Sequence, residues 1–202
     1  LLAALGGAAG EDIVVIGADA RNHGADLTGE GHAWNAARIG GRWALIVATW
    51  DAGNVNGDRF EKEYGTEYLF APPEVQGVTH FPEQERWQLR TPALSRGEFF
   101  RQPMMKAGFF AEGLTLISPD RSQVSVDGEL DLALRNPRQR WLMAHYDDGQ
   151  GGGKGDCAVA GGESAAVRCR FPGPGSYRVR LFVGRQQYGH YTGVGELEAH
   201  SQ

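Results

Sequence analysis

The stretch GHAWNAARIGGRWALIVATWDAG, residues 31–53, decides how the first half of the chain is interpreted. It consists of two strand-like runs joined by Gly40 and Gly41. A Gly-Gly pair between such runs favours a tight hairpin, because both loop positions need a positive φ. If Ile39 pairs with Arg42, the register of the two strands is fixed along their whole length.

That register groups three residues with chemical potential. His32 faces Thr49, and its two diagonal neighbours on the same face are Val47 and Asp51, about 7–8 Å away between Cα atoms. A histidine oriented by a carboxylate is two thirds of a Cys-His-Asp nucleophile system. The alternative interpretation is that His32 is a hydrogen-bonded structural residue, which is the commoner role of a single histidine in a strand.

Apolar residues occur on both faces of the predicted hairpin, which favours a strand pair buried on both sides. One face carries His32, Trp34, Ala36 and Arg38 against Trp43, Leu45, Val47 and Thr49. The other face carries Ala33, Asn35, Ala37 and Ile39 against Ala44, Ile46, Ala48 and Trp50.

The motifs GHAWN at 31–35, Trp43, and ATW at 48–50 resemble the transglutaminase-like family, in particular its kyphoscoliosis-peptidase and hillarin branch. The similarity continues through YGTEY at 64–68, PP at 72–73, HFPE at 80–83 and WQL at 87–89. It covers residues 1–103 well and the remainder more loosely. The resemblance implies an α+β fold: a partial transglutaminase-like, papain-like cysteine proteinase domain followed by an Ig-like β-sandwich.

The resemblance also implies a Cys-His-Asp triad, of which His32 is the base. Val47 occupies the position of the family aspartate, and the family cysteine is expected upstream of Leu1. Asp51 is either a substitute that orients the imidazole or a turn residue at a strand end. Cys157 and Cys169 are weaker candidates for a nucleophile, because an activated thiol needs positive or helix-N-terminal surroundings. His80 is a second possible base, although packing is the favoured role of its segment.

Composition limits the class of protein. The chain has 202 residues, 41% of them hydrophobic, with 30 glycines and 9 prolines, so we expect more strand than helix. The net charge of −5 provides no basic surplus for a nucleic acid. No apolar run approaches the length of a membrane span. Two cysteines do not make a disulfide framework, so a reducing, intracellular compartment is expected.

Charge and turn patterns predict the domain organisation. Residues 1–95 carry 7 Lys+Arg and 13 Asp+Glu, a formal charge of −6, whereas the remainder is at +1 with 13 and 12. We predict a transglutaminase-like domain at 1–95 that lacks its N-terminal part, a connecting segment at 96–112 with Ser95 as a helix cap, and an Ig-like module at 113–202. The module is expected to contain seven strands at 114–118, 123–126, 129–134, 140–146, 165–171, 177–183 and 188–199.

Smaller elements are predicted along the chain as well. Residues 1–10 favour a buried helix, 13–17 a strand, 19–31 a loop that contains His23, and 51–57 a turn-rich loop. Residues 64–70 favour an aromatic strand, Pro72 and Pro73 favour a short helical turn, and the glycine-rich residues 147–162 favour a mobile loop.

Two functions remain open. The first is an active transglutaminase or cysteine peptidase. The second is a module that keeps the fold, has lost the chemistry, and binds other proteins in a cytoplasmic, cytoskeletal assembly, the setting associated with the resembled branch. Val47 favours the second, because a buried valine packs where a carboxylate would be costly to desolvate. We expect no cofactor, no metal, no nucleic acid and no membrane, and partners that are proteins.

Overall fold

The computed structural model describes residues 12–19, 31–49, 51–56, 58–62 and 64–202. The chain forms two compact units, Leu1–Phe99 and Phe100–Gln202. None of the helices formed by the described residues has the length and apolar content that crossing a membrane requires. The helix predicted at 1–10 lies outside the described residues, and so do residues 20–30 of the loop predicted at 19–31, which include His23; its end residues Asp19 and Gly31 belong to strands.

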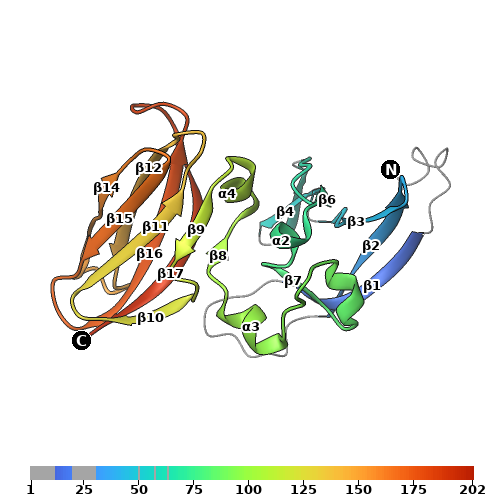
Figure 1. Cartoon of the computed structure of the whole chain (residues 1–202), viewed down its shortest axis with the longest axis horizontal. Helices are drawn as coiled ribbons and strands as arrows, with labels where there is room; N and C mark the ends of the chain where they lie inside the picture. Colours follow the sequence, from blue (N-terminus) through green and yellow to red (C-terminus); the bar gives the residue numbers. More distant parts are fainter. Residues whose placement is uncertain (1–11, 20–30, 50, 57, 63) are drawn as a thin grey trace. The chain divides into compact units, whose positions relative to one another are not determined.

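The first unit is built on a five-stranded antiparallel sheet with the order β6-β3-β2-β1-β7 (Figure 1). Its strands are β1 (Asp12–Asp19), β2 (Gly31–Ile39), β3 (Arg42–Ile46), β6 (Leu69–Ala71) and β7 (His80–Pro82). The strand predicted at 13–17 is confirmed as β1, which has β2 on one side and β7 on the other.

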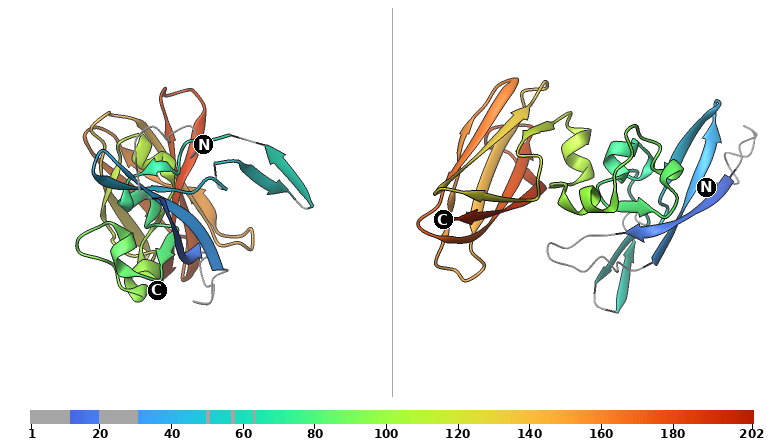
Figure 2. Two further views of the ribbon diagram at one scale, coloured as in Figure 1. Left: turned by 90° about the vertical axis from the view of Figure 1, so that its right-hand side faces the viewer. Right: turned by 60° about the horizontal axis from the view of Figure 1, so that its bottom comes forward.

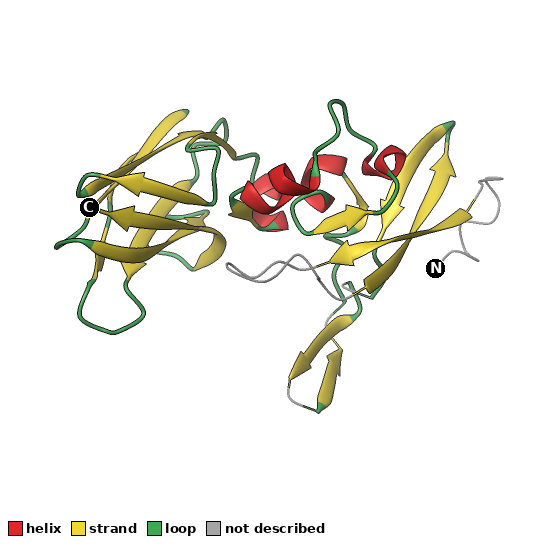
Figure 3. Ribbon diagram, turned by 90° about the horizontal axis from the view of Figure 1, so that it is seen from below, coloured by secondary structure: helices red, strands yellow, loops and turns green. Residues whose placement is uncertain are grey.

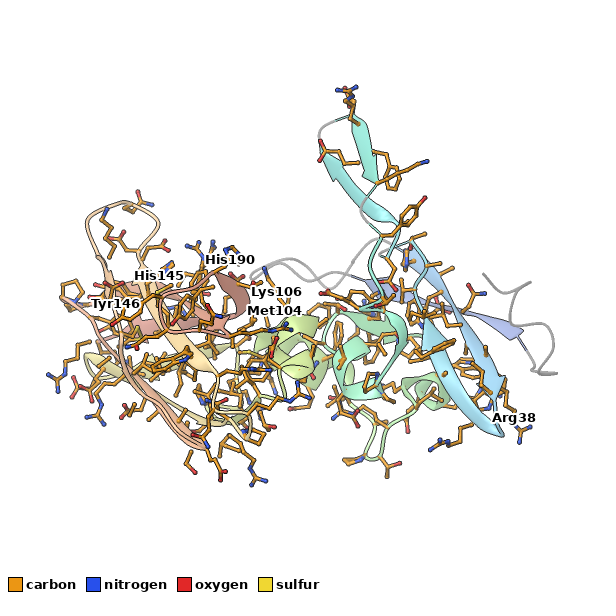
Figure 4. All side chains as sticks on the ribbon, turned by 90° about the horizontal axis from the view of Figure 1, so that it is seen from above. Arg38, Met104, Lys106, His145, Tyr146 and His190 are labelled. Carbon is orange, nitrogen blue, oxygen red and sulfur yellow. A yellow bond between two sulfur atoms is a disulfide. The ribbon has the colours of Figure 1, made fainter. Side chains whose placement is uncertain are left out.

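The β2–β3 hairpin has the predicted register, with Ile39 opposite Arg42. Gly40 and Gly41 have φ values of 56° and 81°, the left-handed conformations that the two-residue turn needs. Arg38 lies beside this turn at the far end of the hairpin, where its Nε donates to the Gly41 carbonyl at 3.4 Å (Figure 4). The ladder ends earlier than predicted, at Ile46.

The face of the hairpin that carries Trp34 and Val47 is buried as predicted, except at Arg38 and Thr49. It forms a core with the 3₁₀ helix η1 (Glu85–Gln88) and comprises Trp34, Ala36, Leu45, Val47 and Trp87, with Trp43, Tyr68 and Leu89 against it. On the other face Ala37 and Ile46 are buried, but Ala33 and Ala48 are exposed. The prediction of burial on both sides is therefore wrong toward the end of the hairpin that carries His32.

The strand predicted over residues 64–70 is also wrong, except at its end, where β6 begins at Leu69. The Gly65 amide donates to the Asp51 carbonyl at 2.9 Å, and the Tyr68 amide donates to the Asp51 carboxylate at 3.0 Å. These bonds hold the backbone in turns that no strand ladder accommodates. The predicted proline-led helical turn is confirmed as α2 (Pro73–Gln76).

A two-stranded arm extends from the first unit, and its first strand lies within the turn-rich loop predicted at 51–57. It consists of β4 (Gly53–Asn56) and β5 (Arg59–Lys62), which pair antiparallel with each other. The arm extends away from the five-stranded sheet (Figure 2). Its alternation is too short, and too polar, to be distinguished from a loop by sequence pattern.

The second unit contains all seven predicted strands. Figure 3 shows that this unit consists mainly of strands. The seven predicted strands are β9 (Thr115–Ser118), β10 (Gln123–Val126), β11 (Glu129–Arg135), β12 (Trp141–Asp147), β15 (Ser164–Arg170), β16 (Gly175–Gly184) and β17 (Tyr191–Ser201). The helices α3 (Arg96–Arg101) and α4 (Ala107–Ala111) precede them, together with β8 (Met104–Met105), which pairs with β17. The Ser95 hydroxyl caps α3 as predicted, accepting from the Glu98 amide at 3.2 Å.

Two sheets share the core of this second unit, one ordered β10-β17-β16-β12-β13 and the other β14-β15-β11-β9, where β13 is Lys154–Asp156 and β14 is Ala158–Ala160. Strict alternation produces that core, since every second residue of β15 is buried. The predicted mobile loop at 147–162 instead contains β13 (Lys154–Asp156) and β14 (Ala158–Ala160). The turn before β13 is organised by the Asp148 carboxylate, which accepts from the amides of Gln150, Gly151 and Gly153.

Cys157 and Cys169 form a disulfide across adjacent strands, with a Cα–Cα separation of 4.3 Å. Ala158 faces Arg168 in the β14–β15 ladder, so the two cysteines are the next facing pair. The two cysteines are therefore bonded to each other, and the cysteine count no longer supports a reducing compartment. Neither sulfur is available as the nucleophile that the sequence left open.

Candidate functional site

His32 lies at the start of β2, in a cluster of four rings that come from β2, β7 and the segment before β6. Its ring stacks on Trp34 with centroids 6.1 Å apart and lies 5.7 Å from the ring of His80. His80 in turn meets Trp34 edge-on at 5.1 Å and Tyr68 at 5.7 Å. We call these four residues the ring cluster. The predicted approach of His32 to Thr49 is confirmed, because Thr49 Oγ1 lies 3.4 Å from His32 Nε2.

The two histidines of the ring cluster have different environments. His32 is half-buried, whereas His80 is only 2% exposed. Burial, followed by the nearby His32, lowers the pKa of His80 to about 3, so that its imidazole is neutral at physiological pH. Its Nδ1 lies 2.9 Å from the Thr79 hydroxyl. The buried, neutral ring of His80 therefore agrees with the packing role that the sequence favoured for this segment over a role as a second base.

Tyr68 completes the ring cluster from the segment before β6. Burial raises the pKa of its phenol, which the hydrogen bond from Thr79 partly offsets. Thr79 thus interacts with both Tyr68 and His80. Thr79, Tyr68 and His80 thus form a connected set of polar groups, and the His80 ring lies next to that of His32.

Val47 occupies the position where the resemblance places a carboxylate. It is 1% exposed and belongs to the same apolar core as Trp34, Leu45 and Trp87. Its amide donates to the Tyr68 carbonyl at 3.1 Å, which is where the chain leaves the β2–β3 ladder. No charged group is compatible with this position without a partner, because desolvating a carboxylate there is expensive.

Asp51 does not continue the strand as the predicted register required. The chain turns after Val47, and the Asp51 amide donates back to the Val47 carbonyl at 3.4 Å. Both oxygens of the Asp51 carboxylate accept from the Tyr68 amide, at 3.0 and 3.2 Å. The carboxylate is therefore engaged in holding residues 65–68, which is the turn role that the sequence left open. Its role toward His32 stays a prediction.

A small cavity lies next to the ring cluster inside the first unit. Its volume of about 10 Å³ has room for about one water molecule. The lining includes Trp34, Gln76, His80, Trp87 and Phe99. Within the described part of the chain, the Trp34 indole N–H and the Gln76 amide have no hydrogen-bond partner. A cavity of this size suits an ordered water and not a substrate.

The proximity of His80 to His32 was not predicted from the sequence, because it depends on the order of the strands in the sheet. β1 pairs with β2 at Gly17–His32 and with β7 at Asp19–His80, so one strand places both histidines at the same end of the sheet. The strands β1 and β7 that pair are more than sixty residues apart in the sequence. Local sequence patterns carry no information about such a distant pairing.

Comparison with known proteins supports one branch. No protein-family profile matches the chain. Kyphoscoliosis peptidase from Mus musculus is 31% identical over 108 residues, which is 52% of this chain and 16% of the relative. The Homo sapiens protein of the same name gives the same figures. Hillarin from Drosophila melanogaster is 24% identical over 133 residues, 57% of this chain and 16% of the relative.

The aligned segment spans about one sixth of each of these relatives, so the activity of the whole proteins does not transfer with it. The motifs that carried the predicted resemblance lie in β2, β3, α2, β7 and η1, and in the segments just after β3 and before β6. Over about half of its length, the chain is similar to kyphoscoliosis peptidase and hillarin, which confirms the predicted resemblance to that branch.

Proposed function

We propose that this chain is part of a transglutaminase-like protein that has lost its Cys-His-Asp chemistry and serves as a structural or protein-binding module in a cytoskeletal assembly. The single observation that carries the proposal is Val47, fully buried against Trp34 where the resembled family has a carboxylate. Its first half is a degenerate transglutaminase-like domain, and its second half, a two-sheet unit that contains the seven predicted strands, is an Ig-like module.

The chemical argument concerns the imidazole of His32. An orienting carboxylate fixes the tautomer of a catalytic histidine and stabilises its charged form, and removing it from a serine enzyme lowers the rate by about 10⁴. Here the position is aliphatic, and Asp51 is committed to the Tyr68 amide. The His32 Nε2 is close to Thr49, a hydroxyl that stabilises an imidazolium less than an anion does.

The proposal is tested with the full-length protein in an assay for incorporation of a fluorescent amine into a glutamine-containing protein. We expect no incorporation and no labelling by a thiol-reactive active-site probe. A matched His32→Ala variant separates turnover at this site from contaminating activity. Turnover by the wild type that is abolished in His32→Ala would overturn the proposal.

The structural role has its own measurement. Full-length protein expressed in cells is extracted with detergent, and the insoluble cytoskeletal fraction is assayed for the wild type and for His32→Ala. We expect equal retention of both, because a scaffold does not use the imidazole. Complete extraction of the wild type into the soluble fraction would contradict the cytoskeletal setting.

A second candidate function is an active transglutaminase or cysteine peptidase, favoured by the retention of His32 at the start of β2 beside two rings. In that case Asp51 orients the imidazole and the nucleophile is supplied by a cysteine outside this chain. Asp51→Asn then lowers amine incorporation as strongly as His32→Ala does, whereas the proposed module shows no incorporation in either variant.

A further inference from the structure

The arm formed by β4 and β5 has a free edge. Among the described strands, β4 and β5 pair only with each other, and all four residues of β5 are exposed. Phe60 at its centre is 53% exposed. A two-stranded ribbon is only marginally stable in water, so a ribbon that extends from its domain gains stability from a further strand. Figure 4 shows the same extension of the arm from a different side.

The pairing pattern decides which backbone groups are available on that edge. Asn56 faces Arg59 with two residues between them, and the closing pair of such a hairpin exchanges both of its hydrogen bonds. Because hydrogen-bonded and non-hydrogen-bonded pairs alternate, the N–H and C=O groups of Phe60 and Lys62 point away from β4. A new antiparallel strand must therefore present its own outward groups to these two residues.

The sequence at this edge, Asp58-Arg-Phe-Glu-Lys62, is complementary to itself when two copies run antiparallel. With Phe60 opposite the second copy's Phe60, Arg59 faces Glu61 twice by symmetry, and Asp58 in the turn before β5 comes near Lys62. Every charged pair then has opposite signs, which stabilises a cross-strand pair, and the two phenyl rings meet at the centre.

The neighbouring registers that preserve the hydrogen-bond pattern are shifted by two residues. In one of them Glu61 faces Glu61 of the second copy, and in the other Arg59 faces Arg59. Like charges directly opposite each other destabilise a strand pair. Alternating charge usually protects a free edge from unrelated strands, and here it selects a single partner and a single register.

We propose that β5 is a self-association edge, through which two copies of this chain join antiparallel with Phe60 on the two-fold axis. This inference is independent of the state of the His32 site. The contact is four residues long and far smaller than a stable dimer interface, so the dimer is weak and depends on protein concentration.

Charge reversal tests the proposal on the 202-residue chain by sedimentation equilibrium, at protein concentrations up to about 1 mM, where weak association becomes measurable. Arg59→Glu alone and Glu61→Arg alone each create two like-charge pairs, and we expect each to raise the dimer dissociation constant about tenfold. The double variant Arg59→Glu/Glu61→Arg restores opposite signs and is expected to recover the wild-type constant. Arg42→Glu, on the exposed tip of the other hairpin, is the matched control and leaves the constant unchanged.

Cross-linking tests the register. Both native cysteines are bonded to each other, so one introduced cysteine supplies a single thiol. Phe60→Cys places two sulfurs on a pair whose Cα atoms are about 5.5 Å apart, within disulfide range, and we expect a covalent dimer under mild oxidation. Lys62→Cys places them four residues apart along the strand, about 13 Å, and is expected to remain uncross-linked.

Three results would overturn the proposal: a monomer at every concentration, a double variant that associates no better than the single ones, or equal cross-linking of Phe60→Cys and Lys62→Cys. The sedimentation series uses only exposed charged positions, so its outcome does not depend on whether the arm tolerates the loss of Phe60.

Discussion

Lowering the pH from 7.5 to 5 is expected to destabilise the first unit by about 2 kcal/mol through one side chain, His80. Burial lowers the pKa of this imidazole to about 3 in the folded protein, whereas the unfolded chain has the ordinary value of 6.5. Because His80 is only 2% exposed, solvent screening does not reduce the effect.

The sign follows from proton binding. Between pH 6.5 and 3 the unfolded chain binds a proton at this position and the folded chain does not, so the free energy of unfolding falls as the pH falls. Each pH unit in that window lowers it by about 1.4 kcal/mol. The pH of 5 lies about 1.5 units below the unfolded-state pKa of 6.5, so the loss in the free energy of unfolding amounts to the stated 2 kcal/mol. Above pH 6.5 the contribution to stability is fully present.

Urea unfolding monitored by tryptophan fluorescence measures this effect, because four of the five tryptophans belong to the first unit. His80→Asn keeps a polar atom near Thr79 and removes the titration, so its loss of stability between pH 7.5 and 5 is expected to be about 2 kcal/mol smaller than that of the wild type. His200→Gln, whose side chain is 42% exposed in the second unit, is the control and keeps the wild-type pH dependence. Equal pH dependence of the wild type and His80→Asn would refute the reasoning.

Three further changes have expected magnitudes. Reducing the Cys157–Cys169 disulfide opens a loop with a sequence separation of 12 and is expected to lower the stability of the second unit by about 3 kcal/mol. Denaturant titrations in which hydrogen exchange reports on the second unit measure this loss, and an unchanged midpoint on adding reductant would contradict it. Ser95→Ala removes the cap of α3 and lowers stability by about 1 kcal/mol, whereas Ser95→Asp retains it. Gly155→Ala places a Cβ 2.6 Å from the Tyr146 hydroxyl oxygen, and this overpacking is expected to lower the free energy of unfolding by about 1–3 kcal/mol and with it the thermal midpoint. Gly161→Ala, with open space around it, is the control and has little effect.

The hairpin and the strands of the second unit were predictable because their signals are local. Gly40 and Gly41 specify a turn that fixes the register, and strict alternation along segments such as 164–170 specifies which residues are buried. These features require information from neighbouring residues only, which a single sequence supplies.

The failures share a different cause. A side chain that captures a distant backbone amide, as Asp51 does with Tyr68, overrides a strand pattern without any local sign of doing so. The meeting of His32 and His80 through β1, and the pairing of Cys157 with Cys169, likewise depend on which strands become neighbours. The candidate site was therefore identified at His32 and Val47, and its surroundings were not.

The disulfide has a mechanical consequence for a chain that carries tension. Cys157 lies between β13 and β14, which belong to different sheets, and its amide donates to the Ala144 carbonyl while its sulfur joins Cys169. A pulling force transmitted along the backbone bypasses the residues between the two sulfurs. In a single-molecule stretching trace, the oxidised second unit is thus expected to release about 40 Å less contour length than the reduced one. As long as the disulfide is intact, the connection between the two sheets at Cys157 cannot be extended by force.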